Sequence, residues 1–302
     1  MEIVAFEPDM AEEVAARYHD AVAGAPFCAP IGGHWFSDRD RLRRQPAREE
    51  ELLVAREGRE AVGFVHAAVA ARATADWHLK REPGVIRFLA YRPGERLVGQ
   101  ALLEAAERWL RDRGRRTLVA GHCAFMYPFY HLPFGHLSER IAHLPPLLGL
   151  AGYVLFESEV FLAWPDYEPP AIPPLTLEVR VVVKGSDDME GLGPGVAVRA
   201  VQDTKRVGEC NMVWLSWEGW RPELAGWCFC SSLHIEEPFQ GQGLGKHLLA
   251  RGLAEMRAAG ARHAMISTDA DNHRAYLFYA NFGFRFLDRT LSFRRPAPRR
   301  RG

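Results

Sequence analysis

The chain has 302 residues, of which 48% are hydrophobic and 25% are charged, with equal numbers of basic and acidic side chains. This length suits one large domain or two of ordinary size, and the composition is that of a globular protein with sizeable cores. The formal net charge of zero provides no global field to attract nucleic acid or anionic lipid, so neither is expected as a partner.

The five cysteines are an odd, scattered set, which argues against a disulfide framework. Cys228 and Cys230 lie two apart in a strand-like run and should share one face as small core residues. The start, Met1-Glu2-Ile3-Val4, is unlike a signal peptide, and no apolar run approaches the ~20 residues that cross a bilayer. We therefore expect a cytoplasmic protein without a membrane partner.

The first half of the chain predicts an α+β unit. Its expected elements are a strand over 2–6, a helix near 10–23, a second helix near 38–44, a strand over 85–91, a helix between Gly99 and Gly114, and a strand over 116–120. The helix after Gly99 carries Val98, Leu102, Ala105 and Trp109 as one apolar stripe.

An unusual loop over 122–146, rich in aromatic residues, His and Pro, follows these elements. Its core, 125–136, is either a wall of an acceptor pocket or an apolar lid packed on its own domain. The histidines of this loop, His122, His131, His136 and His143, match no zinc spacing, and no cysteine pair accompanies them. We therefore expect no metal.

Residues 164–175 contain five prolines, which exclude a helix or a central strand and favour a semi-rigid linker. The linker divides the chain into domains 1–163 and 176–302. In the second domain we expect strands over 177–183, 196–201, 227–235 and 263–267, with a hairpin turn at 202–205. Only 184–195 separates the first two strands, which leaves no room for a helix pair like that of domain one.

The two halves show the same pattern. The helix between Gly245 and Gly260 has the length of the one between Gly99 and Gly114, since 260 − 245 = 15 and 114 − 99 = 15. Each is flanked by strand-like runs, and the segment that begins at Gly152 matches the one that begins at Gly283. A repeat of this size indicates two similar domains rather than a solenoid.

A glycine-rich turn joins strand and helix in domain two. Gly241, Gly243 and Gly245 allow positive φ angles and leave no side chain between the backbone amides and a ligand, and the following helix N-terminus favours phosphate. Tight packing without a ligand also explains such a turn. A dinucleotide-binding unit would instead have G-x-G-x-x-G near the start of a domain, and this turn follows several strands.

A second helix adds evidence for a ligand site. Asn272 is a good N-cap residue, Ala275, Phe278, Tyr279 and Phe282 follow at helical spacing, and Gly283 stands where a helix ends. A purely structural amphipathic helix with Tyr279 in the core is the alternative.

Together, Gln240-x-x-Gly243-x-Gly245 and Asn272-x-x-Ala275-x-x-x-Tyr279 before Gly283-Phe284 resemble the acyl-CoA motifs of the GNAT superfamily of N-acetyltransferases. The resemblance implies an α+β fold (a mixed α/β sheet) built as two tandem GNAT-like domains. It also implies that acetyl-CoA is bound by Leu233, Ile235, Gln240, Gly241, Gln242, Gly243, Leu244, Gly245, Lys246, Asn272 and Tyr279.

The resemblance further implies a mechanism in which an acceptor amine attacks the thioester directly. The amides near Leu233 and Ile235 would polarise the carbonyl, and Tyr279 would protonate the CoA thiolate. The general base is not identified: His234 titrates in the useful range, whereas Glu236 and Glu237 stand where phosphates are expected.

Domain one shows the pattern without the motifs, because Leu97 replaces the middle glycine and Glu95 would face a pyrophosphate. We expect it to be a degenerate copy that binds no CoA but supplies part of the acceptor pocket. The sequence thus predicts an N-acetyltransferase for a small-molecule or peptide amine, with homodimerisation left open. The alternative is a non-catalytic acyl-CoA-binding sensor or regulator.

Overall fold

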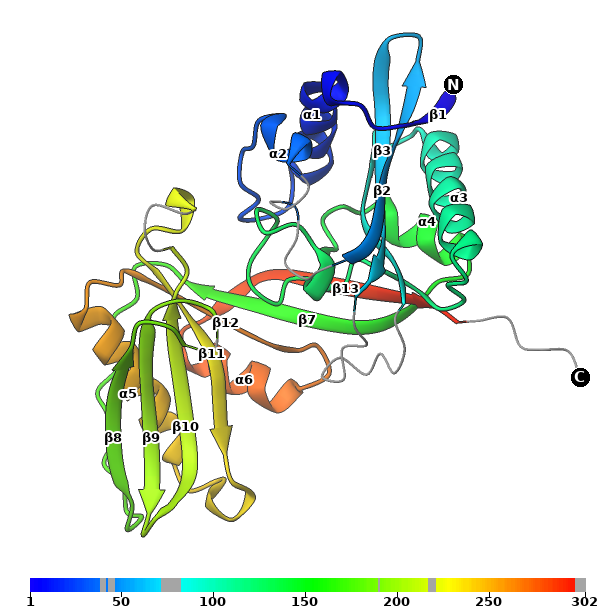
Figure 1. The fold of residues 1–302 in the computed structure, drawn as a ribbon. Helices are drawn as coiled ribbons and strands as arrows, with labels where there is room; N and C mark the ends of the chain where they lie inside the picture. Colours follow the sequence, from blue (N-terminus) through cyan, green and yellow to red (C-terminus); the bar gives the residue numbers. More distant parts are fainter. Residues whose placement is uncertain (39–41, 43–46, 72–82, 190, 217–220, 297–302) are drawn as a thin grey trace, which may run out of the picture. The chain divides into compact units, whose positions relative to one another are not determined.

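The computed structural model describes residues 1–38, 42, 47–71, 83–189, 191–216 and 221–296, coloured along the chain in Figure 1. They form two compact units: unit 1 comprises Met1–Glu159 and Asp288–Gly302, and unit 2 comprises Val160–Leu287. Within the described ranges no helix is both long and apolar enough to cross a membrane.

Unit 1 is built on a mixed sheet. Its strands follow one another in the order β1-β2-β3-β4-β5-β13-β7, antiparallel along β1 to β4, parallel between β4 and β5, and antiparallel between β5 and β13. The strands are β1 (Glu2–Ala5), β2 (Ala47–Glu57), β3 (Glu60–Ala70), β4 (Gly84–Tyr91), β5 (Leu118–Ala120), β7 (Val154–Trp164) and β13 (Arg285–Arg295).

Helices cover both faces of this sheet (Figure 1). On one face lie α1 (Ala11–Val22) and α2 (His34–Ser37), where the ring of Phe36 packs on Phe64 of β3. On the other lies α3 (Arg96–Asp112), whose Leu102 approaches Gly63. Helix α2 ends at Ser37, before the range 38–44 in which the second helix was expected. Most of that range lies outside the described residues.

The aromatic loop folds into its own unit. Phe125, Tyr127, Phe129 and Tyr130 are almost completely buried, and Tyr127 and Phe129 stack within the main core cluster of unit 1. Of the two interpretations of this loop, the packed lid is the one observed. The segment also holds η4 (Cys123–Phe125), β6 (Leu137–Ser138) and α4 (Leu144–Leu150), a helix that the sequence pattern did not predict.

Unit 2 repeats the arrangement with fewer helices. Its strands follow the order β7-β12-β11-β10-β9-β8, and β11 and β12 form the parallel pair. The elements are β8 (Arg180–Ser186), β9 (Gly195–Gln202), β10 (Lys205–Trp214), η5 (Pro222–Leu224), β11 (Trp227–Ile235), η6 (Glu237–Phe239), α5 (Leu244–Ala258), β12 (His263–Asp269) and α6 (His273–Phe282). The first strand begins at Arg180, three residues later than the expected Leu177.

Two strands divide between the units. β7 contributes residues up to Glu159 to unit 1 and the rest to unit 2, and β13 contributes residues from Asp288 onward to unit 1. The expected domain 176–302 therefore differs from unit 2, because the end of β13 pairs with β5 and β6 of unit 1.

The two units share one strand register. Gly63 opposes Tyr91 in unit 1, and Gly208 opposes Ile235 in unit 2. Three residues further along, at His66 (66 − 63 = 3) and Asn211 (211 − 208 = 3), each pairing shifts by one residue. Such a one-residue shift is a β-bulge, and its equal position in both units supports their interpretation as two copies of one fold.

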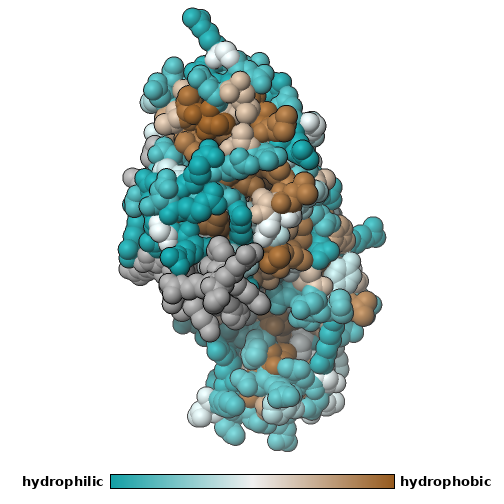
Figure 2. All heavy atoms as spheres, turned by 90° about the vertical axis from the view of Figure 1, so that its right-hand side faces the viewer, coloured by the Kyte–Doolittle hydropathy of each residue, from teal (hydrophilic) through white to brown (hydrophobic). Residues whose placement is uncertain are grey.

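Apolar side chains also reach the surface, as the brown residues among hydrophilic ones show on the face drawn in Figure 2. The large exposed ones in the described residues include Leu97, Leu150, Val154 and Leu155 in unit 1, and Ile172, Leu277 and Phe286 in unit 2. Scattered exposure of this kind is normal for globular proteins.

Candidate functional site

The glycine turn of unit 2 has the geometry that its sequence predicts. Gly241 and Gly243 have φ angles of 75° and 84°, a left-handed conformation that favours glycine. A Cβ atom added at either position would meet no atom within 4 Å. The turn therefore presents bare backbone to open space directly before α5, where unpaired amide groups favour an anion.

The helix α6 forms the facing wall. Asn272 caps its N-terminus, with Oδ1 accepting a hydrogen bond from the amide of Ala275 at 3.1 Å. Gly283 ends it with a φ angle of 118°. Tyr279 is the buried residue of this helix, 7% exposed, and its ring contacts those of Phe278 and Phe284.

Between the two walls lies a cleft of about 490 Å³. The expected cofactor residues line it, with the exception of Gln242 and Leu244: the former donates to the Pro238 carbonyl, and the latter is 1% exposed in the core. The lining residues are Leu233, Ile235, Gln240, Gly241, Gly243, Gly245, Lys246, Asn272, Arg274, Ala275, Phe278 and Tyr279.

The cleft lining combines cationic, polar and apolar side chains. Lys246 and Arg274 supply positive charge, and no carboxylate is among the described residues that line the cleft. The motif reading had not singled out Arg274, Ala275 and Phe278 as cofactor-binding residues. Arg274 follows the N-cap of α6 by two residues. This position, next to the predicted phosphate site, is the sequence feature from which Arg274 could have been predicted as a cofactor-binding residue.

A general base does not emerge from the geometry. No histidine or acidic residue lines the cleft, and the side chain of His234 is 66% exposed, with its Nε2 3.8 Å from Glu236 Oε1. Glu236 and Glu237 flank the turn outside the lining set. Apart from Lys246 and Arg274, the described residues of the cleft lining offer one ionisable side chain, Tyr279.

The thiols of unit 2 belong to its core. Cys210, Cys228 and Cys230 are buried, and the Sγ atoms of Cys210 and Cys230 lie 3.8 Å apart. Burial raises the pKa of Cys228 to about 12, and a hydrogen bond with Cys230 together with burial raises the pKa of Cys210. The thiols of Cys210 and Cys228 therefore stay protonated at neutral pH. All three cysteines are buried packing groups, as expected for Cys228 and Cys230.

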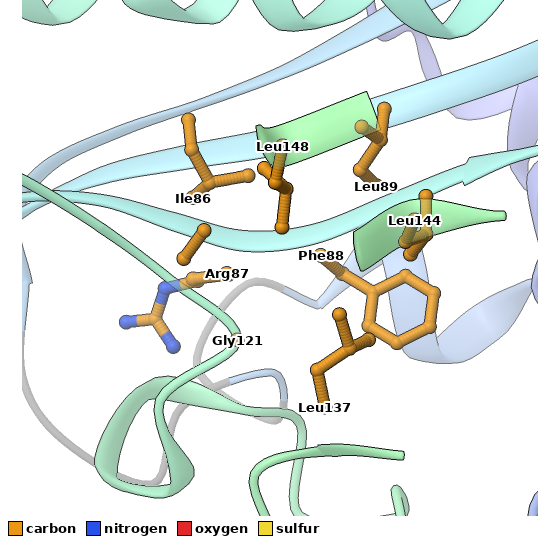
Figure 3. A pocket seen from close by; sticks show the side chains of 9 residues that line it. Ile86, Arg87, Phe88, Leu89, Gly121, Leu137, Leu144 and Leu148 are labelled. Atoms are coloured by element: carbon orange, nitrogen blue, oxygen red, sulfur yellow. The ribbon is translucent and has the colours of Figure 1, made fainter. Parts of the chain in front are cut away.

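In unit 1 the corresponding cleft is filled. The parallel pairing of β4 with β5 ends at Ile86, and the parallel pairing of β11 with β12 ends at Cys230. In each unit the pairing ends directly before the β-bulge described above. In unit 1 the space beyond this point is only about 20 Å³, because Leu137, Leu144 and Leu148 pack into it (Figure 3).

The turn of unit 1 also lacks the features of a phosphate site. A shallow pocket of about 290 Å³ at the start of α3 is lined by two carboxylates, Glu57 and Glu95, and by one guanidinium, Arg96, beside Leu97. The side chain of Leu97, which stands where the other turn has its middle glycine, is 71% exposed. Negative charge at this position opposes the binding of a pyrophosphate.

One cluster of metal-ligating residue types occurs in unit 1, formed by His122, Cys123 and His136. Nδ1 of His122 accepts from the Ala124 amide at 3.2 Å, and Nδ1 of His136 accepts from the Cys123 amide at 3.0 Å. In His122, Nε2 lies 3.1 Å from Glu157 Oε2. The two Nδ1 atoms thus take part in hydrogen bonds with backbone amides of the same loop.

Comparison with known proteins agrees with this geometry. Residues 163–284 match the family model described as Acetyltransferase (GNAT) family. No match was found among curated proteins.

Three solved structures resemble almost the whole chain. A tandem GNAT protein from the clavulanic acid biosynthesis pathway is 17% identical, with a TM-score of 0.64 and coverage of 97% of each chain. A GCN5-related N-acetyltransferase from Sphaerobacter thermophilus is also 17% identical, with a TM-score of 0.63 over 98% of this chain and 96% of that one. A glucosamine N-acetyltransferase region of a fungal multi-domain β-N-acetylglucosaminidase is 14% identical, with a TM-score of 0.68 over 97% of this chain and 38% of that one. At these identities the likeness shows the fold, a tandem GNAT arrangement.

Proposed function

Because residues 163–284 belong to the acetyltransferase (GNAT) family, we propose that the protein transfers an acetyl group from acetyl-CoA to the amine of a small molecule or peptide. The observation that carries this proposal is the cleft of unit 2. Bare glycine amides, a helix N-terminus, two cations and the buried Tyr279 line this one cleft.

In the proposed reaction the lone pair of the amine nitrogen attacks the thioester carbonyl carbon. Backbone amides near Leu233 and Ile235 stabilise the oxyanion that forms. The tetrahedral intermediate collapses with cleavage of the carbon–sulfur bond, and the leaving thiolate takes the phenolic proton of Tyr279. The amine proton passes to water, and water restores the tyrosine. Catalysis then rests mainly on positioning two bound substrates.

Unit 1 is proposed to bind no CoA, because its cleft is filled by leucines and its turn carries carboxylates. A further part of the proposal is that the protein acts in the cytoplasm. The five cysteines are free thiols, in keeping with a reducing compartment.

The test is release of free CoA thiol from acetyl-CoA in the presence of a panel of polyamines, aminoglycosides, amino sugars and peptides. Acceptor-dependent release that needs the full chain supports the proposal. Binding of acetyl-CoA without turnover on any acceptor would favour the alternative, a non-catalytic acyl-CoA-binding regulator.

A further inference from the structure

One face of the unit 2 sheet packs on α5. A Cβ atom added to Gly252 of α5 would lie 3.2 Å from the Sγ atom of Cys210 on β10, so Cys210 points toward this helix. Side chains alternate along a strand, and Glu209 therefore points to the opposite face. In unit 1 that face of the sheet carries α1 and α2. The described residues between β8 and β9 form no helix, so unit 2 has no counterpart of α1 and α2 there.

Strand pairing places a row of ionisable side chains across this opposite face. Arg199 of β9 pairs with Glu209 of β10, and Glu209 pairs with His234 of β11. Residues directly opposite one another in antiparallel strands point to the same side of the sheet. The row therefore runs across three neighbouring strands and ends on β11, the strand that precedes the glycine turn.

The carboxylate of Glu209 holds two arginines side by side. Its Oε2 accepts a hydrogen bond from Nε of Arg199 at 2.8 Å and from Nη1 of Arg206 at 2.7 Å. Glu209 is 8% exposed, whereas the side chains of Arg199 and Arg206 are 40% and 57% exposed. A guanidinium has five donors, and each of these contacts uses one of them. Glu209 thus fixes two partly exposed cations and neutralises only one of them.

Two further cations extend this face. Arg180 and Arg206 both pair with Val201, from its two sides, so the two arginines point the same way. Lys184 pairs with a residue of β9 two positions before Arg199 and shares that face. Arg180 and Lys184 are exposed. In β8 to β10, all of whose residues are described, this face carries one carboxylate and four cations, which together we call the basic face: Glu209, Arg180, Lys184, Arg199 and Arg206.

The basic face reaches the cleft through β11. His234, the last member of the row, stands between Leu233 and Ile235, which both line the cleft. The pairing of β11 with β12 ends at Cys230, ahead of this segment, so β12 does not close the sheet beside Leu233. An acceptor that lies on the basic face can therefore bring its amine to the thioester, which the proposed reaction places near Leu233.

We propose that the basic face binds an anionic group of the acceptor, so that the preferred substrate is an amine that also carries a carboxylate or a phosphate. This inference rests on the proposed function, which leaves the acceptor class open. Guanidinium groups bind both anions through paired hydrogen bonds. The face would repel a polyamine or an aminoglycoside, whose several positive charges meet four cations and one carboxylate.

The experiment uses the full chain and measures release of CoA thiol with acceptors in charge-matched pairs. The pairs are β-alanine with β-alaninamide, phosphoethanolamine with ethanolamine, and the tripeptide amides Ala-Glu-Glu with Ala-Gln-Gln. In the pair that is turned over fastest, kcat/KM should be at least about ten-fold higher for the anionic member. That pair also identifies the source of the anion as a small carboxylate, a phosphate or an acidic peptide. The tripeptide amide Ala-Lys-Lys should be a poorer acceptor than Ala-Gln-Gln.

Substitutions on the basic face should reduce this preference. Arg199→Gln and Arg206→Gln should each raise KM for the anionic acceptor by about ten-fold and leave KM for its neutral partner unchanged. In each variant Glu209 keeps one arginine. The Kd for acetyl-CoA should not change, because neither arginine lines the cleft. Arg180→Gln, at an exposed position, should act in the same direction. Arg285→Gln, at an exposed position of unit 2 on β13, is the matched control and should behave as the wild type does.

Two results would overturn the inference while they support the proposed function. One is turnover that is equal for both members of every pair or faster for the neutral member, and the other is a preference for anionic acceptors that Arg199→Gln and Arg206→Gln leave unchanged. A wild type that binds acetyl-CoA but releases no thiol with any of these amines would refute the proposed amine transfer and, with it, the assignment of the basic face.

Discussion

Nε2 of His131 lies 3.0 Å from Oδ2 of Asp288, and both side chains are completely buried in unit 1. Asp288 stands on β13, at the point where that strand enters unit 1, and Arg140 approaches its second oxygen at 3.4 Å. A buried polar pair, whose two residues are 157 positions apart in sequence, therefore links β13 to the aromatic loop.

Asp288→Ala should therefore destabilise the protein. It leaves the His131 ring and the Arg140 guanidinium without their acceptor, and removal of one partner from a buried pair costs about 3–5 kcal/mol. Urea unfolding measures the change. Glu60→Ala, which breaks a surface ion pair with Arg92, is the control and should have little effect. Equal stabilities of the two variants would show that the buried pair does not anchor β13.

Acidification should weaken the fold through His136. Burial, with a smaller effect of His122 and His131, lowers its pKa from 6.5 to about 3. The unfolded chain takes up this proton near pH 6.5 and the folded chain does not, so the stability is complete above pH 6.5 and falls as the pH decreases toward 3.

Between pH 7 and pH 5 this single group should lower the free energy of unfolding by about 2 kcal/mol. The measurement is the urea midpoint at the two pH values. In His136→Gln the decrease in the free energy of unfolding between pH 7 and pH 5 should be smaller by that amount. His34→Gln, at an exposed position, should show the same decrease as the wild type. An unchanged acid-induced loss in His136→Gln would contradict the assignment.

The leucines that fill the unit 1 cleft should contribute to stability and not to ligand binding. Leu148 is 3% exposed, so Leu148→Ala should cost about 2–5 kcal/mol. Leu150→Ala, on the same helix but 75% exposed, should be nearly neutral. Calorimetry of Leu148→Ala should still show one acetyl-CoA site. A second site created by this change would mean that packing alone excludes CoA from unit 1.

Tyr279→Phe should retain affinity for acetyl-CoA and lose turnover, because only the phenolic proton is removed. General acid catalysis contributes about 10²–10⁴-fold, and a loss of that order is expected in kcat. Tyr276→Phe, on the same helix but outside the cleft lining, controls for packing changes. Turnover equal to that of the wild type would remove Tyr279 from the mechanism.

Short-range signals in the sequence predicted much of the site. Glycine at positive φ and the Asn272 cap depend on neighbouring residues alone, and so the turn and the start of α6 were predictable. The filled cleft of unit 1 could not be predicted in this way. Leu144 and Leu148 belong to α4, a helix whose N-cap residue, His143, makes no side-chain capping hydrogen bond. The contacts of these leucines with β4 depend on the tertiary fold.

The compact units differ from the predicted domains 1–163 and 176–302 for a related reason. The prolines of 164–175 mark a true break in secondary structure, but pairing between strands distant in sequence decides which unit a strand joins. Phe293 pairs with Ala120, a partner that no local pattern of β13 specifies. A fragment that starts near Pro173 would lack Phe161 and Leu162 of β7, both buried.

Acetyl-CoA is proposed to bind in the cleft of unit 2, and calorimetry that compares the full-length wild type with Gly243→Val tests this site. A valine there projects into the open space before α5 and strains a φ angle of 84°. Gly260→Val imposes the same kind of strain at a φ angle of 104°, also in open space but outside the cleft lining. We expect one site per chain in the wild type and in Gly260→Val, and none in Gly243→Val. Two sites in the wild type, or undiminished binding in Gly243→Val, would contradict it.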